Sequence, residues 1–246
     1  MLEGRRVLAV VPARGGSKGV KLKNLREVGG VPLVALAGQV ARALPWIDRA
    51  IVSTDHEGIA RVAEDAGLAC PFMRPEDISG SIISDWQVLI HALTETERID
   101  GVAYDIIVML QPTSPGRTPE HVTATVQHLV RGGFDSVWTL SETDSKSHPL
   151  KQLLISGQGD LSYHDPAGAN IIARQQLKPV FHRNGIAYAM TRDCLTVQMS
   201  ILGAKPGAIV IEGDLPNIDT ELDLLWANFL LEHQAKQGAT GSSPGP

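Results

Sequence analysis

Residues 7–19 read VLAVVPARGGSKG, a short apolar run followed by a loop that is rich in glycine and in cations. An apolar run of this length is typical of a strand that is buried on both faces. The glycines allow backbone angles closed to other residues and let N–H groups approach a ligand closely. Positive charges recur through the loop, at Arg14, Lys18, Lys21 and Lys23, although the chain has a net charge of −5. A cationic loop in an acidic protein indicates a site for an anionic small molecule, and a polyphosphate fits this pattern best.

Length and composition limit the class of protein. The chain has 246 residues, which is long enough for one large α/β domain or for one domain with a sub-domain. Its content of 43% hydrophobic and 20% charged residues is ordinary for a globular protein. Its negative net charge argues against general binding to nucleic acids. No apolar run approaches the roughly 20 residues that a membrane-spanning helix needs, and residues 7–11 are too short for a signal-peptide core. We therefore expect a cytoplasmic protein that binds neither nucleic acid nor membrane.

Strand-like and helix-like segments alternate along the chain. This alternation predicts an α/β fold with a mostly parallel sheet and helices on both faces. Further strands are expected at residues 50–53, 68–72, 106–110, 136–140, 186–190 and 208–211. Helices are expected from Pro32 to Leu44, from a cap at Asp55 to Gly67, over 86–93 after a cap at Ser84 or Asp85, over 119–130, and over 221–233.

The regular pattern is lost over residues 141–183, which are mostly polar and include three histidines. We interpret this stretch as an inserted sub-domain within one domain over residues 1–233. Residues 234–246 are rich in Gly, Ser and Pro towards their end and show no periodicity, so a disordered tail is expected there.

Three polar loops follow expected strands, at residues 14–18, 53–55 and 111–115. In open α/β sheets, ligands bind beyond the carboxyl ends of the strands, so these loops predict one shared site. The first loop matches neither the Walker A pattern nor Gly-x-Gly-x-x-Gly, which disfavours dinucleotide binding.

Some of these motifs also have purely structural interpretations. Gln111, beside threonine and serine hydroxyls, suits a polyhydroxylated substrate, but the same loop can be an ordinary proline turn. The segment 53–55 can be a helix cap, and Arg74-Pro75 a rigid turn. Residues 183–185 contain an Asn-Gly turn signal. Asp219 can cap the last helix or contribute to a divalent cation site.

Taken together, the motifs resemble those of the acylneuraminate cytidylyltransferases, also called CMP-sialic acid synthetases. The resemblance runs from about residue 7 to residue 224, and the segments stand in the order of that family. They are PARGGSKG at 12–19 with Lys23-Asn24, IVSTD at 51–55, Arg74-Pro75, LQPTSP at 110–115, HPLK at 148–151, RQQ at 174–176, RNG at 183–185 with Tyr188, and IDT at 218–220 with Asp223.

The resemblance implies a Rossmann-like, mostly parallel sheet with a small dimerisation sub-domain, within about residues 141–183. It implies a cytidylyltransferase that moves CMP from CTP to the anomeric hydroxyl of a nonulosonic 2-keto sugar acid and releases pyrophosphate. It also implies a requirement for Mg²⁺ and assembly as a homodimer.

The resemblance further implies roles for individual residues. The charges that act on the triphosphate would be those of Arg14, Lys18 and Lys23. The remaining nucleotide contacts would come from Ala13, Gly15, Ser17, Asn24, Arg74, Ser84 and Asp85. The sugar acid would be held by Gln111, Lys151, Arg174 and Tyr188, with Lys151 reaching the site of a partner subunit. The metal would be held by Asp219 and Asn217.

Two positions depart from the family pattern. Asn217 stands where the family commonly has Asp, which removes one negative charge beside the metal. Ser81 stands where an Asp is frequent, near the expected contacts to the nucleobase and ribose. Two alternatives therefore stay open: the same fold acting on another nucleotide such as GTP, or on another 2-keto acid, and a catalytically silent nucleotide-binding protein.

Overall fold

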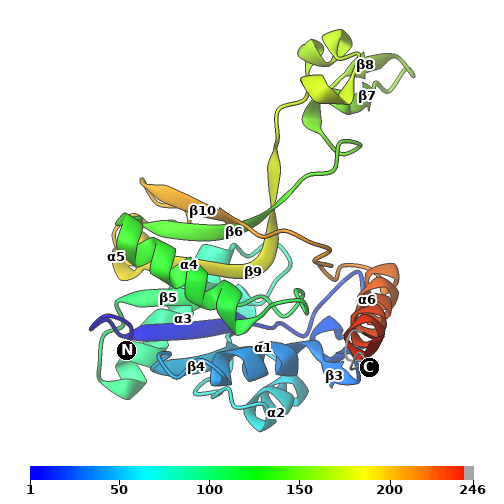
Figure 1. Cartoon of the computed structure of the whole chain (residues 1–246). Coiled ribbons are helices and arrows are strands. Elements are labelled where there is room, and N and C mark those ends of the chain that lie inside the picture. Colours follow the sequence, from blue (N-terminus) through cyan, green and yellow to red (C-terminus); the bar gives the residue numbers. More distant parts are fainter. Residues whose placement is uncertain (241–246) are drawn as a thin grey trace, which may run out of the picture.

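The computed structural model describes residues 1–240 and centres on a six-stranded sheet (Figure 1). The strand order is β10-β6-β9-β5-β1-β4. β9 runs antiparallel to β5 and β6, and the other pairings are parallel. The strands are β1 Val7–Pro12, β4 Arg49–Ser53, β5 Ile106–Met109, β6 Ser136–Glu142, β9 Phe181–Thr191 and β10 Pro206–Val210. The predicted α/β class with a mostly parallel sheet is confirmed.

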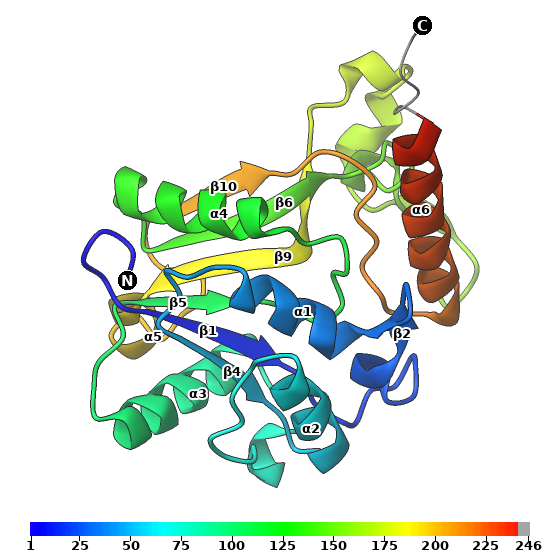
Figure 2. The ribbon, with the colours of Figure 1, turned by 60° about the horizontal axis from the view of Figure 1, so that its bottom comes forward.

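Helices cover both faces of the sheet (Figure 2). One face packs against α1 (Leu33–Arg42), α2 (Glu57–Asp65) and α4 (Pro119–Gly132), and the other against α3 (Asp85–Asp100) and α5 (Arg192–Thr196). Along β1, Val7, Ala9 and Val11 pack in the first layer, whereas Leu8 and Val10 pack in the second. Because both faces are covered, β1 is apolar at successive positions instead of alternating.

The last helix, α6 (Glu221–Thr240), lies beside the hairpin of β2 (Glu27–Val28) and β3 (Val31–Pro32). Leu224 and Ala227 pack in a small core with residues of the N-terminal region, and Asn228 Oδ1 accepts a hydrogen bond of 2.8 Å from the Gly29 N–H. This packing brings the segment that precedes α6 against the glycine-rich loop.

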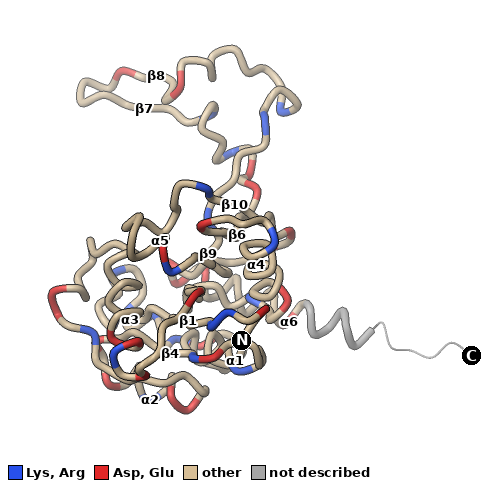
Figure 3. Tube along the Cα trace, turned by 90° about the vertical axis from the view of Figure 1, so that its left-hand side faces the viewer, with Lys and Arg blue, Asp and Glu red and all other residues tan. Residues whose placement is uncertain are grey.

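Residues 143–180 form a lobe that projects from the domain, as two views show (Figures 1 and 3). The lobe contains the hairpin of β7 (Leu153–Ile155) and β8 (Leu161–Tyr163) and three short 3₁₀ helices at Pro149–Lys151, Pro166–Asn170 and Arg174–Gln176. At its base the Thr143 N–H donates to the Val180 carbonyl oxygen at 2.8 Å. The outer ends of β6 and β9 therefore carry the lobe.

Several local predictions were wrong. Residues 68–72 are not a full strand, because only Ala69 forms a bridge, to Ile51. Asp55 does not cap α2, whose N-cap is His56 with Nδ1 accepting from the Gly58 and Ile59 N–H groups. The Asn-Gly pair at 184–185 is no hairpin turn but lies inside β9, opposite a register shift in β6.

The start and end of α6 also differ from the prediction. Thr220 and Asp223 cap the helix reciprocally: the Asp223 N–H donates to Thr220 Oγ1 at 3.3 Å, and the Thr220 N–H donates to Asp223 Oδ2 at 2.7 Å. Asp219 is therefore not the cap. The helix continues to Thr240, beyond the predicted end at residue 233, and residues 241–246 of the predicted tail lie outside the described part. Within residues 1–240 no helix combines the length and the apolar character needed to cross a membrane.

Candidate functional site

A cavity of about 550 Å³ opens at the carboxyl edge of the parallel strands. Its wall combines the loop after β1, the loop after β5, the start of α3, the beginning of β9 and the segment before α6. The polar and charged residues that line it are Arg14, Ser17, Lys18, Lys23, Asn24, Arg74, Ser81, Asp85, Gln111, Thr113, Arg183, Asn217 and Asp219. Ten of the predicted site residues are thus brought together: Arg14, Ser17, Lys18, Lys23, Asn24, Arg74, Asp85, Gln111, Asn217 and Asp219.

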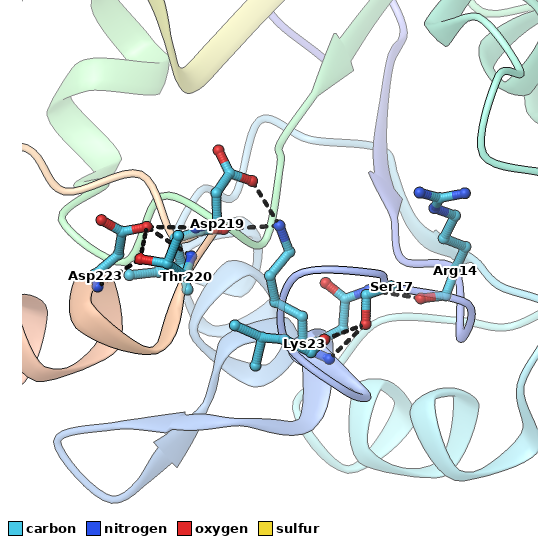
Figure 4. A network of polar contacts seen from close by, with 9 residues as sticks. Arg14, Ser17, Lys23, Asp219, Thr220 and Asp223 are labelled. Atoms are coloured by element: carbon cyan, nitrogen blue, oxygen red, sulfur yellow. Dashed lines mark hydrogen bonds and ion pairs between the residues drawn. The ribbon is translucent and has the colours of Figure 1, made fainter.

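Hydrogen bonds hold the glycine-rich loop in its shape (Figure 4). Ser17 Oγ donates to the Val20 carbonyl oxygen at 2.6 Å and accepts from the Lys23 N–H at 2.9 Å. Asn24 Nδ2 donates to the Arg14 carbonyl oxygen at 2.9 Å. The Gly15 N–H donates to Asp55 Oδ1 at 2.7 Å. Ser17, Asn24 and Asp55 therefore fix the loop, and the Gly15 N–H is already engaged.

The loop also touches the segment that precedes α6. Lys23 Nζ donates to the Ile218 carbonyl oxygen at 2.7 Å and to Asp219 Oδ1 at 2.9 Å (Figure 4). A Cβ at Gly19 would lie closer than 3.0 Å to the Asp219 carbonyl oxygen, a separation that real Cβ atoms essentially never show. Only glycine permits this approach. The contact places Asp219 on the cavity wall beside the cationic loop.

The cations of the cavity differ in how far they are neutralised. Lys23 is paired with Asp219 and only 16% of its side chain is exposed. Among the side chains of residues 1–233, none forms an ion pair with Arg14 or Lys18, which leaves both charges available to an anion. Both positive charges lie on the cavity wall, where they are suited to bind phosphate groups.

Arg74 contributes a buried positive charge. It is 6% exposed, its Nε donates to Ser53 Oγ at 3.0 Å, and its Nη2 donates to the Ser53 carbonyl oxygen. Burial lowers the pKa of Arg74 to about 10, the nearby Asp55 carboxylate opposes this shift, and the Arg14 charge adds to it. The guanidinium therefore stays protonated at neutral pH and adds to the positive potential of the wall.

The side of the cavity near β5 is organised by Arg117, which the sequence analysis missed. This buried guanidinium donates to the carbonyl oxygens of Gln111, Gly185 and Ile186. It ties the Gln111 loop to β9, where Gly185 has a φ of +74°. No local sequence pattern identifies this arginine, because two of its three partners are main-chain carbonyls 68 and 69 residues away.

Arg183 is a second residue that was not predicted as part of the site. It lines the cavity, 3.5 Å from Asp85 Oδ2, and its guanidinium lies 5.3 Å from the centre of the Trp138 ring. Its position directly before the Asn-Gly pair was visible in the sequence, but only the sheet places it opposite α3.

The remaining predicted residues, Gly15 among them, do not line the cavity. Ala13 is fully buried in the core, and Ser84 caps α3 by accepting from the Gln87 N–H at 3.3 Å. Tyr188 is 2% exposed and its hydroxyl accepts from the Gly185 N–H at 2.7 Å, so it supports the wall from beneath. Lys151 and Arg174 lie on the projecting lobe.

The residues of the predicted metal site offer a sparse set of ligands. Among the described residues no group of three or more His, Cys, Asp or Glu side chains gathers in a metal-binding arrangement. Asp219 and Asn217 both line the cavity and supply a carboxylate and an amide oxygen. Mg²⁺ commonly binds through one or two carboxylates together with phosphate oxygens of a substrate and water. The two side chains therefore fit a metal that arrives with a nucleotide.

The sequence of the chain is similar to those of known proteins. A family model described as cytidylyltransferase matches residues 8–212. CMP-N,N'-diacetyllegionaminic acid synthase of Legionella pneumophila is 30% identical over 224 residues, covering 90% of this chain and 94% of that protein. N-acylneuraminate cytidylyltransferase A of Danio rerio is 29% identical, and the match covers 91% of this chain and 50% of that protein.

A solved structure has a similar fold. The structure of CMP:2-keto-3-deoxy-manno-octonic acid synthetase complexed with CTP matches with a TM-score of 0.69 at 17% identity. The match covers 93% of this chain and 99% of that one. At this identity the likeness shows a shared fold.

Proposed function

The chain belongs to the cytidylyltransferase family, and from this premise we propose that it transfers CMP from CTP to a sialic-type sugar acid. The acceptor would be the anomeric hydroxyl of a nonulosonic 2-keto acid, and pyrophosphate would leave. One observation carries the proposal: Arg14 and Lys18, which have no ion pair with any described side chain, line the same cavity as Gln111. The named relatives, which act on legionaminic and acylneuraminic acids, support this choice of acceptor.

The loop after β1 would bind the triphosphate. Nucleotidyl transfer depends mainly on positioning and on neutralising charge at the phosphates. Arg14 and Lys18 supply charges that no carboxylate in the described part of the chain cancels. Lys23 is held by two hydrogen bonds at the junction of the loop and the Asp219 segment, which fixes its ammonium before substrate arrives. Asn24 and Arg74 would lie near the nucleoside part.

The acceptor would lie near Gln111. This side chain can both donate and accept hydrogen bonds, as a polyhydroxylated sugar requires. Arg117 and Tyr188 fix the backbone around it without entering the cavity. The sugar hydroxyl would thereby be held beside the α-phosphorus, and such positioning can supply a large part of the rate enhancement.

A divalent metal, which we propose to be Mg²⁺, would be held by Asp219 and Asn217 together with phosphate oxygens of CTP. When bound, it would neutralise charge on the phosphates. The amide at position 217 provides an oxygen ligand but no negative charge, which favours a metal that binds largely through the nucleotide.

We further propose that the protein is a homodimer and that the projecting lobe forms part of the interface. The lobe exposes several large apolar side chains: Leu153, Leu154, Ile155, Leu161 and Ile172. Exposed apolar groups gathered on one segment are typical of interaction surfaces. Lys151 and Arg174 lie on this lobe, away from the cavity of their own chain, so they would act in the site of a partner.

The test of the function is a matrix of nucleotides and acids. Purified protein would be incubated with Mg²⁺, each NTP and a panel of nonulosonic acids, and pyrophosphate release measured. We expect release with CTP and at least one acid. Release with GTP and none with CTP would contradict the proposal and favour the alternative that Ser81 motivates. Stabilisation by CTP without pyrophosphate from any acid would favour a silent nucleotide-binding protein, the alternative that Asn217 motivates.

The test of the dimer uses complementation. Light scattering should give twice the mass of the chain. Lys23→Met and Arg174→Gln, each impaired alone, should recover activity when mixed. After random exchange of subunits about half of the dimers would be heterodimers, and each heterodimer would contain one intact composite site. A monomer in solution, or no recovery in dimers shown to exchange, would contradict this arrangement.

A further inference from the structure

The cations of the cavity lie on two sides of it. Arg14, Lys18 and Lys23 belong to the loop after β1, whereas Arg183 lies on β9, with β5 between the two strands. If Arg14, Lys18 and Lys23 bind the triphosphate, Arg183 stays available on the Gln111 side of the cavity, where the acceptor would bind. The acceptor of the proposed function carries a carboxylate, and this anion needs a partner of its own.

Arg183 is held loosely in its present contacts. Half of its side chain is exposed, and its ion pair with Asp85 spans 3.5 Å, longer than a good charge-assisted hydrogen bond. A partly exposed pair of this kind contributes little to stability, so a ligand can replace Asp85 at small cost.

The orientation of Arg183 is nevertheless restrained. Its guanidinium lies 5.3 Å from the centre of the Trp138 ring, a cation–π distance. That ring is itself fixed, because Trp138 Nε1 donates to the Ile201 carbonyl oxygen at 3.0 Å. A planar guanidinium that is steadied by an aromatic ring and only weakly paired is suited to bind a carboxylate through two parallel hydrogen bonds.

We propose that Arg183 binds the carboxylate of the sugar acid, replacing Asp85, and thereby selects 2-keto acids as acceptors. This inference rests on the proposed function. It assigns the carboxylate to a residue of the same chain that holds the CTP loop, whereas Arg174 and Lys151 lie on the lobe.

The experiment compares Arg183→Gln with Arg183→Lys, and uses Arg131→Gln on the exposed end of α4 as a control for the loss of one charge. KM and kcat are measured by pyrophosphate release with CTP and an acid that the wild type accepts. We expect Arg183→Gln to raise KM for the acid by about 10- to 100-fold, the range for a hydrogen bond to a charged group. KM for CTP should change less than about threefold, and Arg183→Lys should recover part of the loss.

A derivative of the acid separates carboxylate recognition from general disruption. The corresponding carboxamide, tested as a competitive inhibitor, should bind the wild type and Arg183→Gln equally well. Preferential binding of the carboxamide to the wild type, an unchanged KM for the acid in Arg183→Gln, or an equal rise in KM for CTP would each overturn the assignment. A wild-type protein inactive with every acid would overturn the proposed function first, so the two failures are distinguishable.

Discussion

Lys23→Met tests how the glycine-rich loop and the segment before α6 cooperate. The substitution keeps the length of the aliphatic stem but removes the ammonium, whose donor atoms reach the Ile218 carbonyl oxygen at 2.7 Å and Asp219 Oδ1 at 2.9 Å. Asp219 is 71% exposed, so the ion pair is screened by solvent and the hydrogen bond to Ile218 should dominate the stability loss. We expect the free energy of unfolding to fall by about 1 kcal/mol.

The effect of Lys23→Met on activity should be far larger. Loss of one charge positioned at a developing negative charge typically costs on the order of 10²–10³ in rate. The assay is kcat/KM for pyrophosphate release, with urea unfolding measured on the same preparation. Lys21→Met is the matched control. It removes the same charge from the same loop, but Lys21 does not line the cavity.

Two results would refute this reasoning. If Lys21→Met and Lys23→Met lose activity equally, the loop acts through its total charge and not through the placement of Lys23. If Lys23→Met unfolds at room temperature, the contact between the loop and Ile218 is chiefly structural.

Further substitutions test other parts of the site. Gly19→Ala should lower kcat/KM by about 10²-fold, because its Cβ would push the loop away from the Asp219 carbonyl oxygen, and a displacement of about 1 Å can cost that much in rate. Gly16→Ala, whose Cβ would lie in open space, is the control in the same activity assay. Gly185→Ala should lower the free energy of unfolding in urea by about 1–3 kcal/mol, because φ is +74° and Ser114 and Gln111 fill the space, whereas Gly157→Ala on the open lobe should change it little. Asn217→Asp should lower the Mg²⁺ concentration that gives half-maximal activity, since it adds a charged ligand, and an unchanged Mg²⁺ titration would remove position 217 from the metal site. Burial lowers the pKa of His91 in the folded protein, and the nearby Glu95 opposes this shift. Below about pH 6.5 the unfolded chain therefore binds more protons than the folded protein, and the melting temperature should fall as the pH drops. His91→Asn should show a smaller fall in melting temperature between about pH 7.5 and 5.5.

The regular elements near the site could be predicted from local sequence. β1 and β5 are each buried on both faces of the sheet, as their continuous apolar runs predict. The cap of α3 at Ser84 was one of two predicted candidates, and the cationic loop lies on the cavity as expected. Such features follow from the chemistry of neighbouring residues, because strand and helix periodicity act over a few positions.

The roles of Asp55, Asp219, Arg117 and Arg183 depended on the tertiary structure. Asp55 and Asp219 both looked like helix caps, yet the neighbouring His56 and Thr220 perform that role, and the two carboxylates bind the glycine-rich loop instead. Lys23 and Asp219 are 196 residues apart in the chain. A residue's local pattern shows which interactions it can make, but several candidates within the same turn can cap a helix equally well. The packing of the sheet and of α6 decides which candidate caps the helix and which contacts the glycine-rich loop. This packing depends on the whole chain.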